Sequence, residues 1–201
     1  MIAVVVAEDQ ALLRGALCEI LSRTDDIQVV GQCARGDEVP AEVVRLRPDV
    51  AVLDIEMPGL DGLEVARQLT SVAPATRVLM LTVFGKPGYL RRAMNNGALG
   101  FVLKDSPPDQ LVDAIRRTAN GERVVDPELA ITALRRGDSP LTPRETEVLA
   151  ASRRFPGTAD LARHLHLSAG TVRNTISTAI QKLAATGRAD AARIADDNGW
   201  L

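Results

Sequence analysis

The chain has 201 residues, a formal net charge of −2, 46% hydrophobic residues and only 2% aromatic residues. This length allows two hydrophobic cores, because domains commonly contain about 100 to 150 residues, and the low aromatic content excludes a stacking platform for single-stranded nucleic acid. The two cysteines, Cys18 and Cys33, are too few for a disulfide framework.

The beginning of the chain and its apolar runs bear on its location. Met1 leads directly into the apolar run 2–7 without a basic region or a cleavage site, and no apolar run approaches the length of a membrane span. We therefore expect a soluble cytoplasmic protein that has no membrane partner and keeps its thiols reduced. Residues 1–122 are acidic and the remainder is slightly basic. This asymmetry suits an acidic site followed by a nucleic-acid surface, although ordinary solvated surface charge would give the same count.

Short β-branched runs alternate with amphipathic segments between residues 1 and 120. The alternation is strict, which is typical of a doubly wound, five-stranded parallel sheet covered by helices on both faces. The sequence therefore predicts an α/β domain over residues 1–120. The runs predict strands at 2–7, 27–32, 50–54, 77–82 and 99–103, and the segments predict helices near 10–23, 37–46, 62–71, 86–96 and 107–119.

The pattern changes after residue 120. Residues 121–140 contain a short predicted helix, opened by Asp126 and Pro127, and a polar stretch that ends at Pro140, so we interpret them as a linker. Residues 141–201 contain no strand-like run, which predicts a small all-α domain of four helices. These helices are expected near 143–153, 158–165, 169–184 and 190–198.

Polar side chains stand where the predicted strands end. Glu8 and Asp9 follow the first strand, Asp54 ends the third, Thr82 ends the fourth and Lys104 follows the fifth. In a doubly wound sheet, ligands bind beyond the carboxyl ends of the strands. Three gathered carboxylates repel one another, and their oxygens suit Mg²⁺. A lysine and a hydroxyl beside them could hold a phosphoryl group, and an aspartate there could be its acceptor.

These five residues, together with the stretch Asp54-Ile-Glu-Met-Pro-Gly-Leu-Asp61-Gly62, resemble the receiver domain of two-component response regulators over the whole of residues 1–120. The resemblance implies a flavodoxin-like sheet with strand order 2-1-3-4-5. It also implies that Asp54 accepts a phosphoryl group from a sensor histidine kinase.

The same resemblance assigns roles to the residues around Asp54. Mg²⁺ would be bound by Asp9, by Asp54 and by the backbone carbonyl of Glu56, with Glu8 assisting through water. Two further roles follow for the other strand ends. Thr82 and Lys104 would hold the phosphoryl oxygens, and Phe101 would be the aromatic switch, although an aromatic residue in an edge strand is also explained by simple packing.

The predicted helix at 169–184 has two distinct faces. Ser168 is a good N-cap for it, and one face is apolar at helical spacing: Val172, Ile176, Ala179, Ile180 and Leu183. The other face carries small or polar residues able to reach the major groove of duplex DNA: Gly170, Arg173, Asn174, Ser177 and Gln181. We interpret this helix as a recognition helix, although a polar face can also be merely solvated.

Residues 141–201 resemble the LuxR/NarL-type helix-turn-helix domain. The resemblance rests on Leu141-Thr-Pro-Arg-Glu145, on Gly170-Thr-Val-Arg-Asn174 and on Lys182-Leu183. With the polar face it gives the expected DNA contacts: Thr171, Arg173, Asn174, Ser177, Gln181 and Lys182. We expect Thr171 and Lys182 on phosphates and Arg173 or Asn174 nearer the bases. The segment 86–89 and the final Gly-Trp-Leu resemble a DesR-like subgroup.

A single helix-turn-helix makes few phosphate contacts, so stable binding normally requires two copies on neighbouring half-sites. We expect phosphorylation of Asp54 to favour a homodimer through the first and fifth predicted helices. The apolar residues expected at this surface are Leu12, Leu13, Leu17, Leu111 and Ile115, with the alternative that they only face the sheet.

The sequence as a whole predicts a phosphorylation-controlled transcriptional regulator with duplex promoter DNA, a histidine kinase and RNA polymerase as its partners. We expect no enzymatic activity beyond phosphorylation and dephosphorylation of the receiver itself. One alternative is a phosphorylation-independent DNA-binding regulator whose receiver serves only dimerisation. A phosphohydrolase of the haloacid-dehalogenase type would need an aspartate two positions after the nucleophile, where this chain has Glu56.

Overall fold

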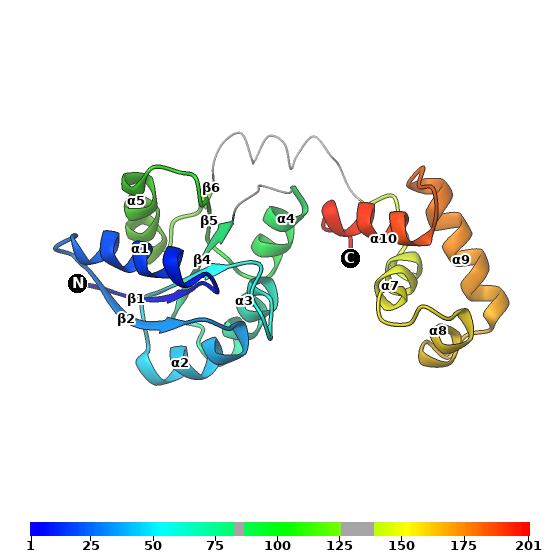
Figure 1. The fold of residues 1–201 in the computed structure, drawn as a ribbon, viewed down its shortest axis with the longest axis horizontal. Coiled ribbons are helices and arrows are strands. Elements are labelled where there is room, and N and C mark those ends of the chain that lie inside the picture. The colour runs from blue at the N-terminus through cyan, green and yellow to red at the C-terminus, as the bar shows by residue number, and fades with distance from the viewer. Residues whose placement is uncertain (83–86, 126–138) are drawn as a thin grey trace. The chain divides into compact units, whose positions relative to one another are not determined.

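The computed structural model describes residues 1–82, 87–125 and 139–201, which fall into two compact units (Figure 1). One unit holds residues 1–85 and 90–131, and the other holds residues 86–89 and 132–201. Lys86 and the predicted helix opened by Asp126 lie outside the described residues. Among the described residues, none of the helices combines the length and the apolarity that crossing a membrane requires.

The first unit is built on a parallel sheet with strand order β2-β1-β3-β4-β5-β6. The order of the first five strands confirms the predicted doubly wound arrangement. Their bounds are Ile2–Ala7 for β1, Ile27–Cys33 for β2, Val50–Asp54 for β3, Arg77–Thr82 for β4 and Gly100–Leu103 for β5.

A sixth strand corrects the prediction of a five-stranded sheet. The strand β6, Val124–Val125, lies within the segment predicted as a linker and pairs in parallel with Gly100 and Phe101 of β5. Two residues are too few to show the alternation that identifies a strand in a sequence. The strand is therefore recognised by its pairing with β5 and not by its own sequence pattern.

Helices cover both faces of this sheet (Figure 1). The helices α1 and α5 lie on one face, and α2, α3 and α4 lie on the other. Their bounds are Ala11–Ser22 for α1, Val39–Leu46 for α2, Gly62–Val72 for α3, Pro87–Asn95 for α4 and Pro108–Ala119 for α5, with a short 3₁₀ turn η1 at Gly36–Glu38. The start of α3 is fixed by a side-chain cap. The carboxylate of Asp61 accepts a hydrogen bond of 2.7 Å from the backbone N–H of Glu64.

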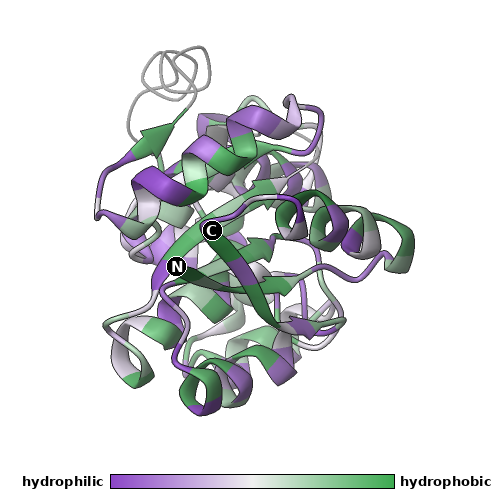
Figure 2. Cartoon of the chain, turned by 90° about the vertical axis from the view of Figure 1, so that its left-hand side faces the viewer, coloured by the Kyte–Doolittle hydropathy of each residue, from purple (hydrophilic) through white to green (hydrophobic). Residues whose placement is uncertain are grey.

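The core of the first unit follows the strand alternation. Alternate residues of β1, β3 and β4, such as Val4, Val52 and Leu81, pack against Leu21 of α1 and Ile115 of α5. The central strand β3 is buried along its whole length, as expected for a strand covered on both faces. In Figure 2 the strands are accordingly drawn mostly in hydrophobic colours, and the helices around them carry hydrophilic residues as well.

The second unit consists of helices, as the sequence predicts. They are α7, Pro143–Ser152; α8, Thr158–His164; α9, Ala169–Lys182; and α10, Arg188–Asp197. Ser168 caps α9 by accepting the backbone N–H of Thr171 at 3.0 Å, which confirms its predicted role as the N-cap. The α8–α9 turn passes through His166, whose φ is 54°.

The helix α9 packs on both hydrophobic clusters of the second unit. Val172 and Ile176 belong to a cluster shared with α7 and α8, and Ala179 belongs to a cluster shared with α7 and α10. The inward face predicted for this helix is therefore confirmed. Trp200 packs against the second of these clusters, so the last residues of the sequence close the core of the unit.

The loop that follows Asp54 is held by close backbone contacts. The N–H of Gly36 donates to the carbonyl of Pro58 at 3.0 Å, and a Cβ added at Gly36 would lie 1.9 Å from the carbonyl oxygen of Leu60. The N–H of Gly62 donates to the carbonyl of Ile55 at 2.9 Å. The loop between β3 and α3 therefore rests on the loop after β2 with no room for a side chain at residue 36.

We predict that the substitution Gly36→Ala lowers the stability of the first unit by about 1 to 3 kcal/mol, because one of the two loops must move to accept the new methyl group. Gly15 of α1 is the matched control, since a Cβ there meets no atom within 4 Å. Gly15→Ala should be neutral or stabilising by up to about 1 kcal/mol. Urea unfolding followed by far-ultraviolet circular dichroism measures both. Equal stability of the two variants would contradict the prediction.

Candidate metal centre and nucleic-acid interface

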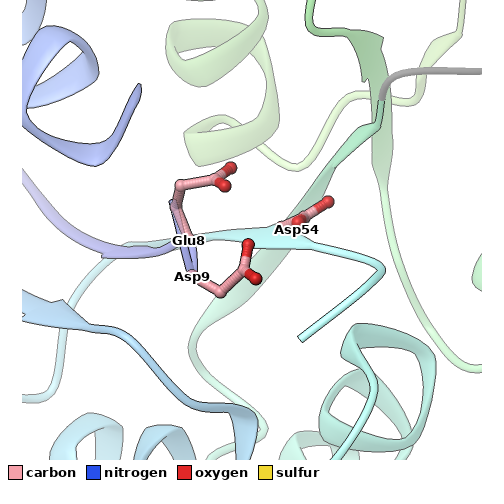
Figure 3. Close-up of side chains that lie close together, drawn as sticks. All are labelled: Glu8, Asp9 and Asp54. Carbon is pink, nitrogen blue, oxygen red and sulfur yellow. The ribbon is translucent and has the colours of Figure 1, made fainter. Parts of the chain in front are cut away.

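Three carboxylates meet beyond the carboxyl ends of β1 and β3 (Figure 3). Glu8 and Asp9 follow β1, and Asp54 is the last residue of β3. One oxygen from each lies within 4.8 Å of the other two. Glu8 and Asp54 are buried, whereas Asp9 is exposed. The cluster therefore has a buried side and a side open to solvent.

A single buried ammonium group bridges the two buried carboxylates. The Nζ of Lys104 lies 2.8 Å from Oε2 of Glu8 and 2.9 Å from Oδ2 of Asp54. The backbone N–H of Lys104 donates to the carbonyl of Thr82 at 2.7 Å, which ties the ends of β4 and β5 together. Thr82 is itself buried at the end of β4. The structure thus brings together all five residues that the sequence places at the strand ends.

Burial controls the protonation of this cluster. It raises the pKa of Asp54, and the hydrogen bonds from Lys104 and from the backbone N–H groups of Ile55 and Glu56 offset only part of that rise. Burial likewise raises the pKa of Glu8, and the charge of Asp54 adds to the effect. For Lys104, burial alone would lower the pKa, but the hydrogen bonds to the two carboxylates outweigh it and raise the pKa.

The charges of the cluster are not balanced. One ammonium serves two buried carboxylates, and Asp9 adds a third negative charge at the exposed side. Proton uptake or a bound cation relieves such an excess. The donor set consists of oxygens only, and it includes an exposed carboxylate that is open to hydrated ions. These are the preferences of Mg²⁺, so the residues present fit that ion.

Two groups beside the cluster were not identified from the sequence. The guanidinium of Arg14 donates to the backbone carbonyls of Glu8 at 2.5 Å and Asp9 at 3.3 Å, and the backbone N–H of Gln10 donates to Oε1 of Glu8 at 3.1 Å. Arg14 therefore links α1 to the loop that carries two of the carboxylates. An arginine within the first turns of a helix that follows an acidic strand end is the only sequence signal, and it does not indicate a backbone contact.

The remaining predicted residues of the receiver site occupy different places. The side chain of Glu56 is exposed two residues beyond Asp54, and its backbone N–H bonds to the Asp54 carboxylate. Phe101 is buried in β5, in register with Met80 of β4, and so lies in the sheet instead of in the cluster. The switch role of Phe101 and the metal-ligand role of the Glu56 carbonyl stay predictions.

The residues predicted to contact DNA all lie on α9 and are exposed: Thr171, Arg173, Asn174, Ser177, Gln181 and Lys182. Val172, Ile176 and Ala179 are buried on the opposite side. Lys182 differs from the other five, because its Nζ forms an ion pair with Oε2 of the buried Glu145 at 2.8 Å. Glu145 was noted from the sequence only as part of a motif.

The residues expected at a dimer surface do not share one environment. Leu17, Leu111 and Ile115 are buried in the core of the first unit, which favours the alternative that they face the sheet. Leu13 is half-buried against the same core. Leu12 is 89% exposed, which leaves it available for a partner.

Fold and site define a class of protein in which a doubly wound unit with an acidic, lysine-containing crevice is joined to a helix-turn-helix unit. Residues 4–116 match the response regulator receiver domain, and residues 139–195 match the luxR family of bacterial regulatory proteins. The chain belongs to the response regulators that carry a LuxR-type DNA-binding domain, and it is a transcriptional regulator controlled by phosphorylation.

Individual relatives support this assignment along the whole chain. The uncharacterized transcriptional regulatory protein YvfU of Bacillus subtilis (strain 168) is 45% identical over 201 residues, which is 100% of both chains. The transcriptional regulatory protein DesR of the same organism is 41% identical over the same span. The crystal structure of the response regulator ChrA of a heme-sensing two-component system is 32% identical, covers 100% of this chain and 98% of its own, and gives a TM-score of 0.59.

The raised pKa values predict a characteristic pH dependence of stability in the absence of divalent cations. The folded pKa values of Glu8 and Asp54 lie above their ordinary values of 4.5 and 3.8. The unfolded chain therefore releases these protons more readily, and the free energy of unfolding should increase as pH falls through the folded pKa values toward the ordinary ones.

Glu8→Gln and Asp54→Asn should each raise the melting temperature at neutral pH, with a gain that shrinks as pH approaches those ordinary values. Each substitution removes one of the buried charges that the folded chain must otherwise accommodate. Differential scanning calorimetry in the presence of a chelator measures the effect. Glu19→Gln, at an exposed glutamate of α1, should give no such pH-dependent gain. A gain that did not vary with pH would contradict the assignment.

Proposed function

We propose that Asp54 accepts a phosphoryl group from a phosphohistidine of a sensor kinase and that the added charge promotes dimerisation and binding to promoter DNA. The observation that carries the proposal is the buried Lys104 ammonium, which lies 2.9 Å from Oδ2 of Asp54 at the only described cluster of three carboxylates able to hold a cation. A cation held beside a carboxylate oxygen is placed to neutralise a phosphoryl group transferred to it.

The chemistry is a single group transfer. An Oδ oxygen of Asp54 forms a bond to phosphorus while the phosphorus–nitrogen bond of the phosphohistidine breaks, and the departing imidazole keeps the bonding electrons and takes up a proton. The backbone N–H groups of Ile55 and Glu56 orient the carboxylate. The ammonium of Lys104 and the hydroxyl of Thr82 would then hold phosphoryl oxygens. Beyond this transfer and its hydrolysis we propose no enzymatic activity.

Mg²⁺ is the cofactor that this site would take. Asp9, Asp54 and the backbone carbonyl of Glu56 would hold it, with Glu8 acting through water. When bound, the ion neutralises negative charge on the phosphoryl group and on the carboxylates. Glu8 also has a structural role in this chain. Its Oε2 forms an ion pair with Lys104, and its Oε1 accepts a hydrogen bond from the backbone N–H of Gln10.

The exposed face of α9 would bind the major groove of duplex DNA. Arg173 or Asn174 would reach the bases and Thr171 a phosphate, since all three lie in the first half of the helix, after the cap at Ser168. Ser177 and Gln181 continue the same face toward its end. With a kinase, promoter DNA and RNA polymerase as its partners, the protein would act in the cytoplasm.

We predict that a small phosphodonor with Mg²⁺ adds the mass of one phosphoryl group to the chain, and that Asp54→Asn abolishes this adduct because the acceptor oxygen is lost. Intact-protein mass spectrometry measures it, and hydroxylamine should remove it as expected for an acyl phosphate. Asp61→Asn is the matched control, since Asp61 caps α3 and lies outside the carboxylate cluster. An adduct that persists in Asp54→Asn would place the acceptor elsewhere.

We predict that Leu12→Ser weakens phosphorylation-dependent dimerisation by about tenfold or more, because replacing one exposed leucine in an interface typically costs about 1 to 2 kcal/mol on each of two symmetric copies. Val72→Ser is the control, because Val72 of α3 is 51% exposed on another helix. Sedimentation with and without the phosphodonor measures the mass. If the wild-type chain is fully phosphorylated and its mass in sedimentation does not change, the proposal fails. The alternative, a regulator whose receiver works without phosphorylation, would then be favoured.

A further inference from the structure

The second unit contains a buried carboxylate that the DNA-binding surface does not explain. Glu145 of α7 is 6% exposed, and its Oε2 accepts two donors: the backbone N–H of Thr142 at 2.6 Å and the Nζ of Lys182 at 2.8 Å. Burial would raise the pKa of Glu145, but the hydrogen bonds from Lys182 and Thr142 outweigh it and lower the pKa. The carboxylate is therefore charged at neutral pH, and Lys182 is its ionic partner.

This pair joins two helix ends that are far apart in sequence. Glu145 lies in the first turn of α7. The hydrogen bond that its side chain accepts from the backbone N–H of Thr142 is one half of a capping box. Lys182 is the last residue of α9. A negative charge at the start of one helix and a positive charge at the end of another are each favoured by the helix dipoles. The contact fixes the C-terminal end of α9 on α7, while Ser168 fixes the other end through its cap.

The two cations of α9 are consequently not equivalent. Arg173 and Lys182 are the only lysine or arginine residues of the helix. Within the described parts of the chain, no ion pair is seen for the exposed Arg173. The side chain of Lys182, in contrast, is 33% exposed and lies against the buried carboxylate of Glu145. A phosphate contact strengthens binding by releasing counterions, which requires positive charge that is not already neutralised by the protein.

We propose that Lys182 is a positioning residue that, together with Glu145, locks α9 onto α7 and does not neutralise a DNA phosphate. This assigns Lys182 a role different from the phosphate contact expected from the sequence. The inference rests on the proposed function only in that α9 is taken as the helix that binds DNA.

The salt dependence of DNA binding separates the two roles. The full chain is titrated against a fluorescein-labelled duplex of mixed sequence at several salt concentrations, and the logarithm of affinity is plotted against the logarithm of salt concentration. Arg173→Gln should lower the magnitude of the slope by about one. Lys182→Met should give a line parallel to that of the wild type but displaced to weaker binding. A slope reduced by about one in Lys182→Met would overturn the proposal.

Thermal unfolding followed by the fluorescence of Trp200, the only tryptophan of the chain, tests the lock without DNA. Glu145→Gln keeps a residue able to complete the capping box and removes only the charge. Lys182→Met leaves a buried charge without its partner and should lower the midpoint by about 4 to 8 °C. The double variant should lose less than the sum of the two single variants, because each already breaks the same contact.

Glu147→Gln is the matched control for this cycle, because Glu147 lies on the same helix in an exposed pair with Arg144 and should leave the midpoint unchanged. Additive losses in the Glu145 and Lys182 variants would overturn the lock. The proposed function fails separately, if neither the wild-type chain nor its phosphorylated form binds the duplex at any salt concentration. In that event the thermal cycle still decides whether the pair fixes α9.

Discussion

The receiver site depends on one buried ammonium group shared by carboxylates from two different strands. Lys104 reaches Glu8 at the end of β1 and Asp54 at the end of β3 from its own position after β5. This ammonium holds three strand ends together. Its single positive charge cannot neutralise the two buried carboxylates that it contacts. The remaining negative charge favours uptake of a divalent ion. A phosphoryl group on Asp54 would draw the same ammonium toward its oxygens and away from Glu8.

The ion pair of the second unit shows the opposite balance. Glu145 and Lys182 match one negative charge with one positive charge, and a backbone N–H and a helix end complete the environment of the carboxylate. A balanced pair of this kind has no excess charge to attract a ligand, and its effect is to fix the relative position of two helices. The balance of buried charges thus distinguishes the two places. The carboxylate cluster has excess negative charge that can attract a cation, whereas the Glu145–Lys182 pair only fixes the positions of two helices.

The sequence was sufficient where regular patterns continue over several residues. Alternation identified five strands, helical periodicity identified the inward face of α9, and strand ends located the residues that meet at the carboxylate cluster. β6 was missed because two residues carry no period. For α1 and α5, the apolar pattern did not separate residues that pack on the sheet, such as Leu17 and Ile115, from the exposed Leu12. The partners of Arg14 could not be identified because they are backbone carbonyls, and the partner of Lys182 could not because it lies 37 residues away in the sequence.

The two thiols of the first unit illustrate what burial does to reactivity. Cys33, the last residue of β2, is 3% exposed, and burial raises the pKa of its thiol to about 11. Burial also raises the pKa of Cys18 in α1. The thiolate is the form of cysteine that reacts with oxidants and binds metal ions. Neither residue forms it in appreciable amount at neutral pH. The two thiols are therefore poor targets for oxidants and for metal ions, and the burial of Cys33 at the end of β2 shields its sulfur further.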